Sequence, residues 1–286
     1  MENGVQFEHT HRLVATAVGL ATIALAVLLH RRRAADPLGA VLGWTALGLV
    51  CVQGGLGGVT VLMRLPLLVT MAHLATSMVF FCVTVLIAAR VTMGGATRLP
   101  PRQLPPSPPP ETGHAGFLLE REGEDPALAQ LRPWAGVVVG VTFVQILLGG
   151  LVRHTASGLA CFGIPLCNGE LWPAQAGAHL HMTHRMLALF VAALVVALAV
   201  AVLRRARRVP GGSRVARLAV AAMGLVAVQI GLGVLSVFSL LALAPVTLHL
   251  GVAALLLVCN VALFYYLPAR VRAPESVQIG EAARAW

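Results

Sequence analysis

Residues 182–203, MTHRMLALFVAALVVALAVAVL, begin with a histidine–arginine pair and continue as an apolar run. A run of this length crosses the roughly 30 Å hydrocarbon layer of a membrane as a helix. Residues 9–29, HTHRLVATAVGLATIALAVLL, have the same form, and residues 52–57, VQGGLG, return as residues 228–233, VQIGLG. The chain therefore repeats itself, and we expect two related sites, each built from two helices.

The composition is that of a polytopic membrane protein. Hydrophobic residues make up 58% of the 286 residues, whereas charged residues make up 11%. Backbone groups inside a membrane must be hydrogen-bonded within the segment, so apolar runs of this length are helices. We expect an all-α transmembrane bundle of seven helices, in pseudo-symmetric halves of three and four helices. The predicted helices cover 11–29, 38–63, 66–89, 134–152, 178–203, 215–240 and 246–267.

The repeat also divides the chain into domains. Residues 1–91 form the predicted N-terminal half-bundle, and residues 134–270 form the C-terminal half-bundle. Between them, residues 92–133 hold nine of the seventeen prolines and are predicted to be a disordered cytoplasmic linker. Residues 271–286 are a predicted cytoplasmic tail.

The net charge of +10 comes from arginine alone, since the chain has no lysine. The arginines lie at the ends of the predicted helices, where they favour the cytoplasmic side. This pattern predicts an N-terminus outside and a C-terminus in the cytoplasm, and it argues against a nucleic-acid partner. We expect a bacterial inner membrane location, in contact with lipid. The clusters are Arg31–Arg33, Arg204–Arg205, Arg207–Arg208, Arg214, Arg217, Arg270 and Arg272.

Four histidines occupy equivalent positions in the two halves: His11 and His73 in the first, His184 and His249 in the second. Each lies 17–21 residues before an arginine of the cytoplasmic clusters or Arg90, which is about 25–32 Å along a helix. A lone histidine in a helix is more often a packing residue, but four at one depth indicate a site. Zinc prefers four close ligands. Two imidazoles on separate helices suit the axial positions of a heme iron instead.

Arg12 and Arg185 follow the first histidine of each pair. Their guanidinium groups are suited to hold heme propionates by charge-assisted hydrogen bonds. An equally weighted alternative is that they anchor the helix start at the membrane surface.

These motifs resemble the heme A synthase family. The resemblance rests on residues 8–12, EHTHR, on His184-Arg185, on the Gln-x-x-x-Gly helices and on residues 149–161, GGLVRHTASGLAC. It implies two four-helix halves, one of which binds heme b through His184 and His249. The other half would receive heme O at His11 and His73 and oxidise one ring methyl to the formyl group of heme A. Heme O synthase and terminal oxidase assembly factors are the partners that the family implies.

Glu8 distinguishes the first half from the second. It stands one helical turn before His11, whereas the equivalent residue before His184 is His181. A carboxylate beside a heme edge can accept protons during C–H oxidation. The alternative is that Glu8 interacts favourably with the positive end of the helix dipole. The resemblance adds weight to catalysis, because the family's proposed catalytic glutamate has this place in its motif.

Cys161 and Cys167 lie in the predicted external loop, where the intervening Gly163 and Pro165 allow the chain to turn back. An oxidising exterior favours a disulfide, and the resembled family often has a cysteine pair here. Two unpaired thiols are the alternative.

The first half departs from the family pattern. The counterpart of the helix at 134–152 would lie before residue 1, so the chain has three helices plus four, where the family has four plus four. The family's external cysteine pair in the first half is also absent from the sequence given. Two other functions therefore stay open: a non-catalytic heme-binding membrane protein, and a bis-histidine cytochrome b that transfers electrons.

Overall fold

The computed structural model describes residues 2–64, 66–96, 126–207 and 212–268, with side chains from His9 in the first helix and up to Thr92 in the third. Within these residues, seven helices are long and apolar enough to cross a membrane. The predicted all-helical, seven-span fold is therefore confirmed for a multi-pass membrane protein. The long helices are α1 (Glu2–Arg31), α2 (Pro37–Leu62), α3 (Leu67–Ala96), α5 (Arg132–His154), α6 (Ala176–Ala206), α7 (Ser213–Phe238) and α8 (Leu243–Tyr266).

Two short helices accompany the long ones: α4 (Pro126–Ala129) and the 3₁₀ helix η1 (Ser157–Leu159). Helical structure extends into both ends of the proposed linker, because α3 continues to Ala96 and α4 begins at Pro126. Residues 97–125 and the proposed tail at 271–286 lie outside the described residues.

Consecutive long helices pack against one another. Helices α5, α6, α7 and α8 form a closed four-helix bundle, because α5 also contacts α8. The largest buried apolar cluster lies among α5, α6, α7 and α8 and includes Val195, Val202 and Leu263. Helix α3 contacts both α5 and α8. A Cβ at Gly150 of α5 would lie 2.5 Å from a Leu74 methyl of α3, so the absence of a side chain permits this close approach.

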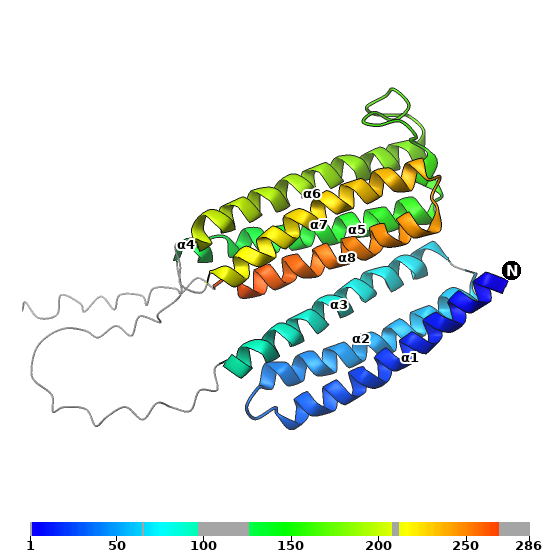
Figure 1. Ribbon diagram of the computed structural model, residues 1–286. Coiled ribbons are helices and arrows are strands. Elements are labelled where there is room, and N and C mark those ends of the chain that lie inside the picture. The colour runs from blue at the N-terminus through cyan, green and yellow to red at the C-terminus, as the bar shows by residue number, and fades with distance from the viewer. Residues whose placement is uncertain (1, 65, 97–125, 208–211, 269–286) are drawn as a thin grey trace, which may run out of the picture.

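Consecutive long helices run in opposite directions (Figure 1). Helices α1, α3, α6 and α8 all begin at the end of the bundle that carries the N-terminus (Figure 1). The histidines at 11, 73, 184 and 249 lie in the first third of these helices. The structure therefore gathers all four at one end, which we call the histidine end.

An ion pair joins helices at the opposite end. Asp36 caps α2 by accepting a hydrogen bond from the Gly39 N–H at 2.9 Å, and Pro37 occupies the first turn, as is common at helix starts. The Arg90 side chain of α3 donates to the same carboxylate at 2.7 Å. The Arg90 hydrogen bond, followed by the Gly39 N–H, holds the pKa of Asp36 below its usual value.

Candidate functional site

His184 of α6 is held by a glutamine of the preceding helix. The Gln145 side-chain amide donates to the backbone carbonyl of His184 at 3.0 Å, and the same nitrogen lies 3.0 Å from Nδ1 of the ring. The His184 imidazole also lies within electrostatic reach of His249, His181 and Arg185. The structure thus brings together the two histidines of the C-terminal half, which are 65 residues apart in sequence.

His249 of α8 has a similar neighbour on α7. Nε2 of the Gln229 side chain lies 3.3 Å from Nε2 of the His249 ring. Nδ1 of His249 and Oε1 of Gln229 are buried without a protein partner.

His73 of α3 repeats this arrangement with α2. The Gln53 amide donates to the His73 backbone carbonyl at 3.0 Å and to the Thr76 hydroxyl at 2.7 Å. Nδ1 of the His73 ring is buried without a partner. His11 of α1 is exposed but within electrostatic reach of His73, so the second predicted pair is also brought together.

These pairs suit a heme better than a bare metal ion. Among the described residues, no group of three or more His, Cys, Asp or Glu side chains could hold a metal ion. A heme supplies four equatorial nitrogens itself and needs only axial ligands from the protein. The partnerless Nδ1 atoms of His73 and His249 are buried polar atoms that a ligand would satisfy. The donor set therefore fits a heme group.

The cysteine loop, residues 155–175, joins α5 to α6 at the histidine end (Figure 1). Cys161 and Cys167 form a disulfide, with Cα atoms 4.6 Å apart, so the prediction of a bridge is confirmed. Arg185 donates from Nη1 to the Gly163 carbonyl and from Nη2 to the Cys161 carbonyl, both at 2.5 Å. The arginine next to His184 is therefore engaged with the loop by two of its five N–H donors.

His181 and Glu8 are the residues that distinguish the two predicted halves. The structure describes the side chain of His181 but not that of Glu8. His181 is buried, and Nδ1 of its ring has no hydrogen-bond partner. Glu8 lies in α1, one turn before His11, but its side chain is outside the described residues. Arg12 lies on the exposed surface of α1 beside His11.

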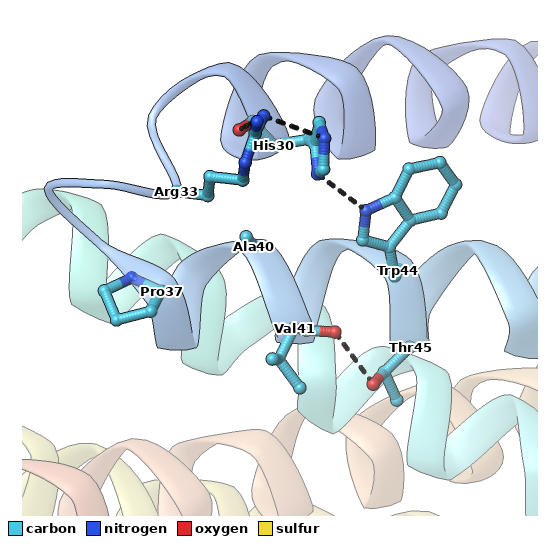
Figure 2. Close-up of a pocket in the computed structure, with 7 residues that line it drawn as sticks. All are labelled: His30, Arg33, Pro37, Ala40, Val41, Trp44 and Thr45. Atoms are coloured by element: carbon cyan, nitrogen blue, oxygen red, sulfur yellow. Dashed lines mark hydrogen bonds between the residues drawn. The ribbon is translucent and has the colours of Figure 1, made fainter.

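A separate pocket lies at the other end of the bundle, between α1 and α2 (Figure 2). It has a volume of about 680 Å³ and is lined by His30, Arg33, Trp44 and four smaller residues. The Trp44 indole donates to Nδ1 of His30 at 3.2 Å, and Nη1 of Arg33 lies 3.0 Å from Nε2. His30 is 19 residues, or about 28 Å of helix, from His11, so this pocket is distinct from the histidine end.

Sequence reasoning missed Gln145 and the loop contacts of Arg185. The signal for Gln145 was present, because residues 145–149, QILLG, are a third Gln-x-x-x-Gly segment beside those at 53–57 and 229–233. The Arg185 contacts had no such signal, since they join residues 22 and 24 positions apart through an irregular loop.

Comparison with known proteins identifies the family to which this chain belongs. The sequence model of the COX15-CtaA family, described as cytochrome oxidase assembly protein, matches residues 4–261. The heme A synthase of Symbiobacterium thermophilum is 31% identical over 245 residues, which cover 85% of this chain and 73% of that protein. The heme A synthase of Shewanella oneidensis is 28% identical over 287 residues, covering 91% and 76%. The match extends over helices of both predicted halves, and the chain therefore belongs to the COX15-CtaA family, as the resemblance to heme A synthases predicted.

Proposed function

We propose that this protein is a membrane-bound heme A synthase, which oxidises a ring methyl group of heme O to the formyl group of heme A. The observation that carries the proposal is the relation to heme A synthases over 85% of the chain, combined with four histidines that pair at one end of the bundle. Fold alone does not define an activity, but paired imidazoles in a heme-enzyme family do support one.

We assign heme b to His184 and His249 in the C-terminal half, residues 134–270. Both rings contact a glutamine of a neighbouring helix. Arg185, the residue after His184, donates a hydrogen bond to the cysteine loop. Such contacts orient an axial ligand before the cofactor binds. When bound, heme b would supply electron transfer.

We assign heme O to His11 and His73 in the N-terminal half, residues 1–91. The exposed His11 ring leaves this pair more open than the C-terminal pair, which suits a substrate that must enter and leave. Glu8, one turn from His11, is the proton acceptor in this proposal, and Arg12 would bind a propionate. Arg185 would use its remaining N–H donors in the same way for heme b.

We place the histidine end outside and the arginine-rich end in the cytoplasm of a bacterial inner membrane. The arginines at 31–33, 90 and 204–205 lie at the ends of α1, α3 and α6 that face away from the histidines. The disulfide lies at the histidine end, which suits an oxidising compartment. Under this orientation the 97–125 segment is a cytoplasmic connection.

The test is conversion of heme O in cells. The full chain is expressed in a strain that makes heme O but has no heme A synthase, and extracted hemes are separated by chromatography. We expect heme A with the wild-type chain and only heme O with a His11→Ala, His73→Ala double variant. A control replaces His30, which is at the opposite end, with Ala and retains heme A.

The same experiment distinguishes the alternatives. Purified wild-type protein with one low-spin heme b but no heme A in the cells would favour a non-catalytic heme-binding protein. Two low-spin hemes, each lost with one histidine pair, would favour a bis-histidine cytochrome. Either result would overturn the proposal.

A further inference from the structure

Three helices of the bundle carry a short glutamine–glycine motif that faces a histidine of another helix. A Gln-x-x-x-Gly segment lies on α2, α5 and α7, and each contacts a histidine on the helix that follows it in sequence. Residues four apart lie on the same face of a helix, so the glutamine and glycine of each segment face the same neighbour. The three sets are Gln53, Gly57 and His73; Gln145, Gly149 and His184; and Gln229, Gly233 and His249.

The glycine of each segment makes room for the imidazole. A Cβ built on Gly149 would lie 2.9 Å from Cε1 of His184, which is too close without a shift. A Cβ on Gly233 would lie 3.1 Å from Cε1 of His249, which is also tight. A Cβ on Gly57 would lie 3.6 Å from Cε1 of His73, an ordinary contact. The fit is therefore tightest at the two histidines of the C-terminal half.

At His184 and His249, the glutamine contacts a ring nitrogen that is bonded to this Cε1 atom. At His184 the Gln145 amide contacts both Nδ1 and the backbone carbonyl, which limits rotation of the ring and of the helix that carries it. At His249, the Gln229 side-chain amide lies 3.3 Å from Nε2 of the imidazole. A side chain that contacts one ring nitrogen fixes the orientation of the whole imidazole ring.

We propose that Gln145 with Gly149, and Gln229 with Gly233, form two cradles that set the orientation of the His184 and His249 imidazoles as axial ligands. This inference rests on the proposed heme b site and adds four positioning residues to it. Gly57 is looser, so the same cradle at His73 tolerates a methyl group.

The test compares alanine variants with matched controls on the same helices. Gly149→Ala and Gly233→Ala add a methyl group against a histidine. Gly140→Ala on α5 and Gly231→Ala on α7 add the same methyl group where no atom lies within 4 Å. We expect the two cradle variants to lose heme b at least about 10-fold, or to change the low-spin electron paramagnetic resonance signal. The two controls and Gly57→Ala should retain the wild-type heme content and signal.

A second measurement needs no bound heme. If the added methyl group clashes with the imidazole, Gly149→Ala lowers the Tm of the heme-free protein in detergent. The same change should have little effect in a His184→Ala background, because the clashing ring has been removed. Gln145→Leu keeps the size of the side chain but not its N–H groups, and should shift the heme midpoint potential without removing the heme.

The outcomes separate this inference from the proposed function. Wild-type protein that binds no low-spin heme would contradict the heme b assignment on which the inference rests. Wild-type protein that holds heme, with both cradle variants indistinguishable from Gly140→Ala and Gly231→Ala, would overturn the cradles alone. Equal loss of Tm from Gly149→Ala in both backgrounds would also overturn them.

Discussion

Replacing Arg185 with methionine should release the cysteine loop from α6. The guanidinium group donates to the carbonyls of Cys161 and Gly163, and it is partly buried. A hydrogen bond to a charged group contributes about 1.5–3 kcal/mol. Because the loop lies at the protein surface, we take the lower value for each bond, or about 3 kcal/mol together. Each 1.4 kcal/mol is a factor of ten, so opening of the loop should become roughly 100-fold more frequent.

Amide hydrogen exchange measures this opening directly. In the purified full chain, peptides within residues 155–175 should exchange roughly 100-fold faster in Arg185→Met than in wild type, while peptides from α7 stay unchanged. Arg153→Met is the control, since Arg153 is an exposed arginine at the same end. Arg185→Lys keeps the charge but not the two-pronged donor group, and should give intermediate exchange.

Unchanged exchange in Arg185→Met would refute the reasoning. It would mean that the guanidinium group does not hold the loop and is available for other partners. Loss of heme without faster loop exchange would then support the role of Arg185 as a propionate ligand.

Three further predictions concern the site and the opposite end. His249→Ala should abolish or convert the low-spin heme spectrum of the purified protein, since an axial nitrogen is lost; an unchanged spectrum would contradict the assignment. Glu8→Gln should retain heme b but lose about 10²–10⁴-fold of heme O conversion, measured by pigment chromatography; wild-type amounts of heme A would show that Glu8 only stabilises the helix start. Asp36→Asn should lower the Tm at pH 7, because the carboxylate pairs with Arg90 and caps α2. The pKa of Asp36 is below the usual value of about 4, so this stabilisation is complete above pH 4 and disappears as the pH falls through the lowered pKa. A Tm difference between Asp36→Asn and wild type that stays constant from pH 7 to pH 3 would refute this role.

The helices could be predicted from the sequence because each is determined by its own residues. An apolar segment in a membrane must satisfy its backbone hydrogen bonds internally, so length and composition suffice. The predicted runs at 178–203 and 215–240 lie within three residues of the observed ends of α6 and α7. The disulfide was predictable for the same local reason, since Cys161 and Cys167 are six residues apart.

Pairing of the histidines was predictable because the chain repeats. The spacing that relates His11 and His73 to His184 and His249 places them at one depth, and antiparallel helices then bring them to one end. The repeat does not identify which neighbouring side chain contacts each ring. Gln145 was therefore overlooked, although it carries the same segment as Gln53 and Gln229.

Contacts between helices were decided only by the tertiary structure. In a soluble protein the polar face of a helix indicates how it is rotated, but in lipid most faces are apolar and this signal is weak. The position of Gly149 against His184 depends on that rotation, and so does the ion pair between Asp36 and Arg90, which are 54 residues apart. The sequence by itself determined the helices, their direction and the depth of the histidines. The packed bundle decided which side chains touch them, because a contact across two helices depends on the axial rotation of both.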